Sequence, residues 1–463
     1  MKDITEFFTS ESDYPDLDSD GAVKRLSAAI RCVTVNDGTN DAGFEALQAL
    51  MRESYPAVMR AGSFELIGRS VLITIPGGNR ERLPALFMSH QDVVPVVAGT
   101  ENDWTYPAFS GAIADGYIWG RGTLDIKNQV FGILEAAEYL LSRGASFERT
   151  VYFAFGEDEE TYNFGAKAIS DTLRSRGIRL EFVLDEGGGK IQSGAAFGAP
   201  EISFSQIDLM EKGYADLELS AKSAGGHSSR PFGGTSLGRL SCAIAHIVEH
   251  PFPAELSPVV KGTFSALAPY ITEEPLKTLA SDLDKNASAL ADYCLGVPDL
   301  FPLVTTTIAP TIIRGSSAAC NVMPQNMEVV VNFRIAEGHT ADEVMEKCQR
   351  VVADPEVSLR FLQANDPSAT ARTDGFGYRT LKAAMNRYFQ NVVVIPSMTA
   401  GATDAHHYEQ ICDTCLRCSP FMGNEDEVER GVHGTDEKLS LRAYAQGIRV
   451  LIRIMETLTE QEA

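Results

Sequence analysis

The stretch VYFAFGEDEE, residues 151–160, combines an apolar run of strand length with four acids that follow a glycine. Apolar runs at residues 85–88 and 182–184 also lead directly into polar segments, which contain His90 and Asp185. In open α/β sheets, sites form just beyond the carboxyl ends of the strands. These three stretches therefore predict a cluster of carboxylates and histidines at one edge of a sheet.

The first 210 residues alternate between helical and strand patterns. Alternation of this kind predicts a parallel or mixed sheet that is covered by helices, and therefore an α/β fold. Helices are expected at residues 22–31, 42–61, 126–141 and 164–176, and strands at residues 71–75, 85–88, 151–155 and 182–184.

The sequence pattern changes near Lys212. Residues 214–221 (YADLELSA) and 327–335 alternate polar and apolar side chains, which is typical of half-buried strands. Helical patterns accompany these strands at residues 236–249 and 341–352. The pattern of the first 210 residues then resumes, with a helix expected at 377–388, a strand at 392–395 and a helix at 438–458.

These changes of sequence pattern predict two domains. We expect a discontinuous α/β domain formed by residues 1–211 and 366–463. A smaller α+β domain with an antiparallel sheet, residues 212–365, is expected to interrupt it.

Composition excludes several classes of partner. The chain has 463 residues and a net charge of −23, from 40 basic and 63 acidic residues. An apolar content of 44% and a charged content of 22% indicate a soluble globular protein, and the length predicts two or three domains. A polyanionic surface of this size disfavours nucleic acid and anionic membranes as partners.

No targeting or membrane segment is expected. The first twenty residues lack a basic-then-apolar signal pattern, and no stretch approaches the roughly 18 apolar residues that span a bilayer. Eight cysteines in a chain of this length do not make a disulfide scaffold. The sequence therefore predicts a cytoplasmic protein without a membrane partner.

Three of the cysteines, Cys412, Cys415 and Cys418, form a C-x-x-C-x-x-C pattern. Zinc and iron–sulfur sites use such spacings, but a fourth thiolate is missing nearby. At strand spacing the three side chains would not share a face, and cysteine is a commonly buried small residue. We interpret them as structural.

Five polar segments carry the candidate chemistry. His90 and Asp92 point the same way on an extended chain, so the carboxylate can orient the imidazole. Asp125 follows a glycine-rich approach, and its two oxygens can bridge two metal ions. The acids at residues 157–160 can divide the roles of metal ligand and general base.

Each segment also has an ordinary structural explanation. His90 fits a turn, Asp125 fits a helix N-cap, and the four acids fit a solvated turn. The glycines after Asp185 (GGGK, residues 187–190) do not match a phosphate-binding loop. His433 precedes an expected helix start at residues 435–437. The joint occurrence of the five segments predicts a hydrolase that depends on a divalent metal.

With these segments in view, the chain closely resembles a family of zinc metallopeptidases and amidohydrolases. The family includes carboxypeptidase G, carboxypeptidase S, acetylornithine deacetylase, succinyl-diaminopimelate desuccinylase and aminoacylase. The sequences of the motifs are most similar to those of the carboxypeptidase S branch. One departure is the motif GATD, which has alanine where relatives often show glycine. The motifs appear in family order: HQDVVP (90–95), WGRGTLDIK (119–127), DEE (158–160), LDE (184–186), GHSS (226–229), NVMP (321–324), GATD (401–404) and His433.

The resemblance implies a di-zinc exopeptidase fold, in which helices sandwich a mixed sheet and a lid domain is inserted. It also implies two Zn²⁺ ions per subunit, with Co²⁺ or Mn²⁺ as substitutes. Asp125 would bridge the two ions, and Glu159 would be the general base while Asp92 orients His90. The remaining ligands would be His90 and Asp185 on one ion, and Glu160 and His433 on the other.

The resemblance assigns substrate contacts to the lid. His227 would stabilise the oxyanion, often from the partner subunit, so a homodimer through the lid is expected. Asn321 and Arg334 would hold the substrate carboxylate, because the planar guanidinium can bind it at two points. A surface ion pair is the alternative for Arg334, and His406 is an additional candidate for substrate contact.

The predicted activity is hydrolysis of an amide or peptide bond next to a free carboxylate, of the carboxypeptidase or dipeptidase type. An N-acyl-amino-acid deacylase on the same site is the alternative, so the substrate is a small peptide or an N-acyl amino acid. A binding-only protein is disfavoured because Glu159 and the ligand set are intact. A phosphoryl-transfer enzyme is disfavoured because no phosphate-cradling loop is apparent.

Overall fold

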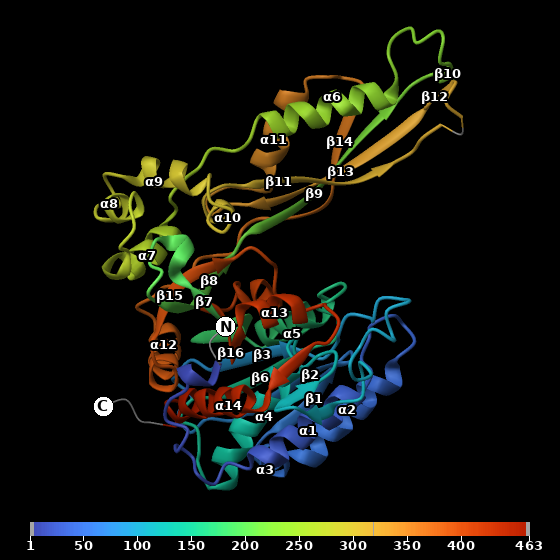
Figure 1. Ribbon diagram of the computed structural model, residues 1–463. Coiled ribbons are helices and arrows are strands. Elements are labelled where there is room, and N and C mark those ends of the chain that lie inside the picture. The colour runs from blue at the N-terminus through green and yellow to red at the C-terminus, as the bar shows by residue number, and fades with distance from the viewer. Residues whose placement is uncertain (1–3, 318, 460–463) are drawn as a thin grey trace.

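The computed structural model describes residues 4–317 and 319–459, and it shows a large domain beneath an elongated smaller one (Figure 1). The large domain is built on one eight-stranded sheet. Its strands, in their order across the sheet, are β1 (Ser63–Ile67), β2 (Ser70–Ile75), β6 (Val151–Gly156), β3 (Ala85–His90), β7 (Phe182–Ser193), β16 (Cys415–Asn424), β8 (Ser203–Glu211) and β15 (Val392–Thr399).

The sheet is mixed, as the sequence predicts. Strand β3 pairs in parallel with both β6 and β7, and β16 and β15 continue with parallel pairs to β7 and β8. Strands β1 and β2 add an antiparallel edge next to β6. The carboxyl ends of β3, β6 and β7 therefore meet at one edge of the sheet, directly below the small domain (Figure 1).

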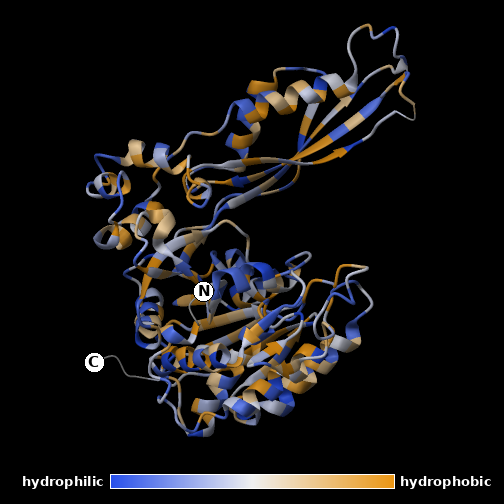
Figure 2. Cartoon of the chain, in the orientation of Figure 1, coloured by the Kyte–Doolittle hydropathy of each residue, from blue (hydrophilic) through white to orange (hydrophobic). Residues whose placement is uncertain are grey.

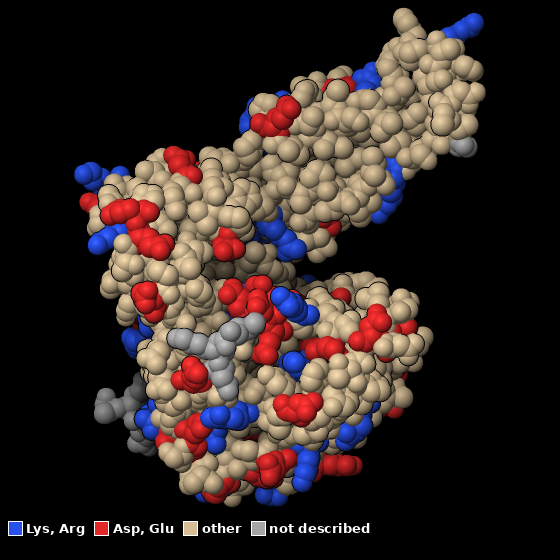
Figure 3. Space-filling view, in the orientation of Figure 1, with Lys and Arg blue, Asp and Glu red and all other residues tan. Residues whose placement is uncertain are grey.

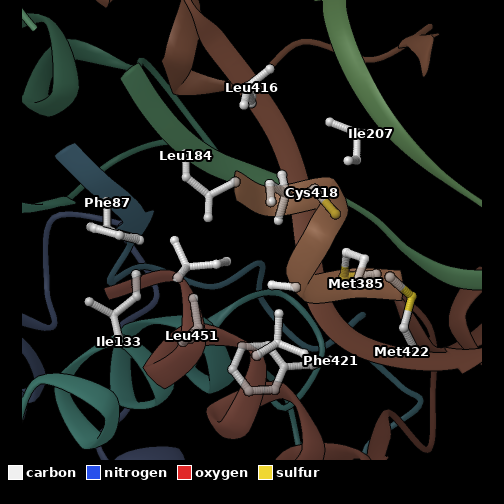
Figure 4. Packing of buried hydrophobic residues seen from close by; sticks show 14 of the residues in the cluster. Phe87, Ile133, Leu184, Ile207, Met385, Leu416, Cys418, Phe421, Met422 and Leu451 are labelled. Atoms are coloured by element: carbon white, nitrogen blue, oxygen red, sulfur yellow. The ribbon is translucent and has the colours of Figure 1, made fainter. Parts of the chain in front are cut away.

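Helices cover both faces of this sheet. Strand β3 is buried on both sides, since Ala85 and Phe87 join one hydrophobic cluster whereas Leu86 and Met88 join another. Figure 4 shows Phe87 near Leu184 and Ile133 in the first cluster. Helices of the first face are α1 (Ser19–Arg31), α2 (Asp41–Ser54), α3 (Pro56–Ala61), α4 (Lys127–Ser142), α12 (Phe376–Tyr388) and α14 (Leu441–Glu456), while α5 (Phe164–Ser175) and the short helix η4 (Asp404–Tyr408) cover the second.

The small domain has its own antiparallel sheet and its own core. Alternate residues of its strands, such as Leu217 and Leu219, pack under two helices together with Val329 and Val331. Figure 2 shows the alternation of hydrophobic and hydrophilic residues along these strands. Across the sheet the strands are β11 (Thr307–Arg314), β13 (Asn326–Ile335), β9 (Gly213–Lys222) and β14 (Val357–Asn365), and the helices are α6 (Ser236–Glu249) and α11 (Ala341–Val352).

Further α-helices within the described part of the stretch 212–365 pack elsewhere. The first of them contributes Val259 and Phe264 to the hydrophobic cluster of the large domain, beside Phe197 and Ile207. The inserted stretch therefore supplies residues to both cores, and the predicted boundaries at 212 and 366 stay predictions. These helices are α7 (Pro258–Leu267), α8 (Leu276–Ala280), α9 (Ala287–Cys294) and α10 (Phe301–Val304).

Several predicted helices have different limits in the structure, and in two of them the difference changes the secondary structure. The helix expected at 42–61 is divided between α2 and α3, because Pro56 restricts Tyr55 to a non-helical conformation. The helix expected at 438–458 begins only at Leu441. Residues 438–440 instead form β17 (Lys438–Ser440), which pairs with β5 (Tyr117–Trp119) next to β4 (Ala112–Ala114).

The three clustered cysteines lie on opposite faces of the sheet. Cys412 and Cys415 belong to the cluster under α5, whereas Cys418 belongs to the other one (Figure 4). All three are buried and free of disulfides, which agrees with a structural role. No helix in the described part of the chain has the length and apolar character that crossing a membrane requires.

Candidate metal centre

The predicted polar segments meet where β3, β6 and β7 end. His90 is the last residue of β3 and lies in register with Gly156, the last residue of β6. Glu159 and Glu160 follow in the turn after β6, and Glu186 lies on β7 just beyond the part that pairs with β3. Parallel strands place these side chains at one sheet edge.

Two groups of potential metal ligands form at this edge. In the first, Nε2 of His90 lies 3.1 Å from Oδ1 of Asp125 and 3.4 Å from Oε1 of Glu186. In the second, Nε2 of His433 lies 3.1 Å from Oδ2 of Asp125 and 3.1 Å from Oε2 of Glu160. Within each group the ligand atoms are all within 4.8 Å of one another. Asp125 thus turns one oxygen to each group.

The structure does not bring Asp185, the predicted ligand, to the group that contains His90. Successive residues of a strand point to opposite faces, and here Glu186 faces His90. Asp185 is buried on the other side, where Oδ2 accepts a hydrogen bond from the Ala405 amide at 2.9 Å and Oδ1 accepts one from the Glu186 amide at 2.8 Å. Glu186 takes the place predicted for Asp185.

Asp92 connects His90 with the acidic turn. Its carboxylate is fully buried and lies 3.3 Å from Nδ1 of His90. The two oxygens of Asp92 also accept hydrogen bonds from the amides of Glu159 and Glu160, at 3.1 and 3.0 Å. One side chain therefore holds an imidazole and the turn that carries two further site residues.

Glu437 fixes the loop that carries Asp125, a role that the sequence pattern does not predict. Its buried carboxylate accepts hydrogen bonds from the amides of Gly122 at 3.0 Å, Leu124 at 2.7 Å and Asp125 at 3.2 Å. The Arg121 guanidinium lies 2.6 Å from the same carboxylate. Arg121 belongs to the motif at residues 119–127 and Glu437 to the expected helix start at residues 435–437, but only their contact in space reveals this role.

The electrostatics of the centre favour bound cations. Burial and the neighbouring Glu186 carboxylate raise the pKa of Glu159 well above its usual range, and burial raises the pKa of Glu186 to about 7. Hydrogen bonds with Asp125 and Glu160 raise the pKa of His433 to about 10. Crowded carboxylates of this kind are stabilised by positive charge.

The donor set also fits divalent ions. Each group combines one imidazole with two carboxylates, which are ligand types that zinc and similar metals use. Oε1 of Glu160 is buried and has no hydrogen-bond partner in the described part of the chain. A carboxylate oxygen without a donor suits coordination better than burial alone, since unsatisfied buried polar atoms are costly.

His227 and Asn321 lie together, but apart from these groups. β10 (Gly226–His227) pairs with β12 (Val322–Met323), and the Ser228 amide donates to the Asn321 carbonyl at 2.8 Å. This pairing forms at the far end of the small domain (Figure 1), and both residues are exposed. The structure therefore does not bring His227 or Asn321 to the metal groups of their own chain.

Arg334 lies at the other end of the small domain. Its Nη1 donates to the carbonyl of Ala400, in the large domain, at 3.3 Å, and its guanidinium lies 4.7 Å from the centre of the Tyr214 ring. His406 is held by Glu211, whose Oε1 lies 3.2 Å from its Nδ1. Burial opposes a charge on His406, but Glu211 outweighs it and raises the pKa.

The fold and the paired ligand groups together define a metal-dependent hydrolase. The chain belongs to Peptidase family M20/M25/M40, which matches residues 86–457. The family predicted from the motifs is thereby confirmed.

The chain is similar along nearly its whole length to two kinds of curated relative. An N-fatty-acyl-amino acid synthase/hydrolase from Danio rerio is 32% identical, over 98% of this chain and 90% of the relative. A probable carboxypeptidase S-like protein from Dictyostelium discoideum is 31% identical, over 96% and 85%. The second of these relatives carries the name of the branch that the motifs favour.

Solved structures show the same two-domain fold. The M20 metallo-carboxypeptidase of Sulfolobus solfataricus superposes with a TM-score of 0.66 at 16% identity, covering 95% of this chain and 99% of its own. Human carnosine dipeptidase 1 gives a TM-score of 0.64 at 15% identity and covers 99% of each chain. At these identities the likeness shows the fold alone.

Proposed function

We propose that this protein is a di-zinc hydrolase that cleaves an amide or peptide bond next to a free carboxylate, as carboxypeptidases and dipeptidases do. One observation carries the proposal: the two oxygens of Asp125 face two histidines, His90 and His433, each at 3.1 Å. A carboxylate shared in this way suits two metal ions that act on one substrate. Co²⁺ or Mn²⁺ are expected to substitute for Zn²⁺.

The protein side chains divide the remaining work. Two divalent ions bound there would polarise the amide carbonyl and lower the pKa of the attacking water. Glu159 takes the proton from that water and passes it to the leaving nitrogen, which is the role of a general base and then of a general acid. Asp92 holds the Glu159 amide at 3.1 Å and so keeps the base in place.

Arg334 is proposed to bind the free carboxylate of the substrate. It lies where the small domain meets the loop at Ala400, and Tyr214 supports its guanidinium. The planar fork of arginine binds a carboxylate through two hydrogen bonds. We also propose that His406, in the segment next to Asp404, contacts the substrate.

We further propose a homodimer in which one subunit supplies His227 and Asn321 to the site of the other. Both residues are exposed at the far end of the small domain. Apolar side chains are exposed there as well, with Phe232 fully exposed, Ile313 62% exposed and Val322 46% exposed. The neighbouring β11 is an edge strand, and an unpaired edge favours association with another chain.

Hydrolysis of N-acyl amino acids is the alternative on the same site. Curated relatives named as N-fatty-acyl-amino acid synthase/hydrolase share 30–32% identity with this chain, which supports that substrate class. Both activities need an amide, a neighbouring carboxylate and the same general base. The free state of all eight cysteines is compatible with the cytoplasmic location that we propose.

One substrate panel tests the proposal. Dipeptides, N-acetyl amino acids and N-hexadecanoyl amino acids are incubated with purified protein, after chelation and again after addition of Zn²⁺, Co²⁺ or Mn²⁺. We expect hydrolysis that is lost on chelation and restored by metal. Full turnover in the chelated protein would contradict the proposal.

A further inference from the structure

A cavity of about 140 Å³ lies directly beside the metal groups. Asp125 and Glu186, two of the three residues of the first ligand group, form part of its wall. The wall is otherwise mainly apolar, with contributions from Leu124, Phe421 and Val428. A group that enters this cavity therefore lies against the residues that bind the metal.

The volume of the cavity limits what it can accept. An apolar cavity of about 150 Å³ in another protein holds one benzene molecule. The cavity here is of the same size, so it fits a branched aliphatic or phenyl group. The straight chain of a long fatty acid is larger than this space.

The lining also selects by charge. Among the described residues that line the cavity, there is no lysine, arginine or histidine that could pair with an acidic substituent. Val428 comes from α13 (Glu425–Gly431), whose first turn carries Glu425, Asp426 and Glu427. Figure 3 shows acidic side chains gathered in the region of α13, below the small domain. A carboxylate that entered between these mainly apolar walls would lose its hydration without pairing to a cationic side chain, so an uncharged substituent is favoured.

Asn128 gives the cavity a polar contact point. Its side chain lines the cavity and is 1% exposed, and no donor in the described ranges, 4–317 and 319–459, reaches its Oδ1. A buried acceptor without a donor is costly, so a ligand that offers an N–H at this point is favoured. An amino-acid residue on the acyl side of the scissile bond offers such a group.

We infer that this cavity is a specificity pocket for the acyl side of the substrate, and that it takes an uncharged apolar side chain of up to phenyl size. The inference rests on the proposed function. The scissile carbonyl must lie at the metal groups, so its own substituent is the part closest to Asp125 and Glu186. The carboxylate on the amino side lies toward Arg334. Val428 sets the depth of the pocket, and Asn128 accepts the N–H of the acyl-side residue.

The first test is a series of dipeptides with a common C-terminal alanine and glycine, alanine, leucine, phenylalanine or glutamate before it. We expect kcat/KM to rise about fourfold for each methylene that is buried, from glycine to leucine. The glutamyl substrate is expected to fall at least tenfold below the leucyl one. Val428→Phe fills the pocket, so it should lose leucyl and phenylalanyl hydrolysis while glycyl hydrolysis is retained. Asp426→Phe adds the same bulk on the exposed side of α13 and is the matched control.

A second readout does not depend on activity. Binding of 3-methylbutanamide to the metal-free protein is followed by saturation-transfer NMR, in the wild type and in both variants. We expect the signal to disappear in Val428→Phe and to persist in Asp426→Phe, with both variants unfolding at the temperature of the wild type.

The outcomes separate the pocket from the proposed function. If hydrolysis depends on metal but changes neither with side-chain size nor with Val428→Phe, the proposal of the pocket is wrong and the proposed function still holds. Preference for hexadecanoyl over leucyl substrates would lead to the same conclusion. Absence of metal-dependent hydrolysis for every substrate would overturn the function, and the pocket with it.

Discussion

Oδ2 of Asp125 lies 3.1 Å from Nε2 of His433, and this contact joins the loop before α4 to the segment before α14. The other oxygen of Asp125 faces His90 at the end of β3. Three segments that are far apart in the chain thus converge on one carboxylate.

Glu159→Gln should separate metal binding from catalysis. The amide has the size of the carboxyl group but cannot take a proton, so kcat should fall by about 10²- to 10⁴-fold. Metal content should equal that of the wild type, since Glu159 belongs to neither ligand group. The matched control is Glu157→Gln, in the same turn, whose carboxylate faces Arg69 and should leave kcat within about twofold. An unchanged kcat in Glu159→Gln would remove it as the base.

Glu186→Gln and Asp185→Asn form a second matched pair. We expect Glu186→Gln to weaken metal binding, because Glu186 faces His90. Asp185→Asn should keep the metal content of the wild type, because its side chain bonds the amides of Ala405 and Glu186. Metal titration by calorimetry measures both. The reverse pattern would restore Asp185 as the ligand.

Mixing two inactive variants tests the proposed exchange of His227 between subunits. His227→Ala lacks the lid histidine and Glu159→Gln lacks the base, so each homodimer should be nearly inactive. In a mixed dimer, the site that keeps Glu159 can receive His227 from the partner, and activity should return to about a quarter of the wild-type value in an equimolar mixture after subunit exchange. If the mixture is no more active than its parts, His227 does not act between subunits.

Asp208 should make stability depend on pH. Burial raises the pKa of its carboxyl to about 7, partly offset by the hydrogen bond from Gln206 and by Arg417. A raised folded-state pKa means that the stability linked to the protonated form is complete below the unfolded pKa of about 4 and is lost as pH rises through about 7.

The variant Asp208→Asn removes this dependence. The free energy of unfolding of Asp208→Asn, measured in urea relative to the wild type, should increase from about pH 4 to about pH 7 and stay level above that. A difference that stays constant across this range would mean that Asp208 titrates at the same pH in the folded and unfolded chain.

The sequence predicts the regular elements well where the pattern is long and periodic. The helix patterns at 236–249 and 341–352 coincide with α6 and α11, and the apolar run at 151–155 with β6. His90, Asp125, Glu160 and His433 also come together as their positions at strand ends and turns suggest. These features depend on local periodicity and on the rule that sites form beyond the carboxyl ends of parallel strands.

Other features depend on contacts that periodicity does not encode. Asp185 and Glu186 are adjacent acids, and only the register of β7 beside β3 decides which of them faces His90. Lys438 begins a short strand because Trp119 lies opposite it. The helices at 258–304 join the larger core because of the apolar surface near Ile207, which no local pattern identifies.

The most direct test of the central claim is the number of zinc ions bound per chain in the wild type and in Asp125→Asn, measured by elemental analysis after dialysis. If Asp125 bridges two ions, the wild type should bind two Zn²⁺ per chain, and Asp125→Asn should weaken both sites together. One Zn²⁺ per wild-type chain, or two in Asp125→Asn with unchanged affinity, would contradict the two-metal account.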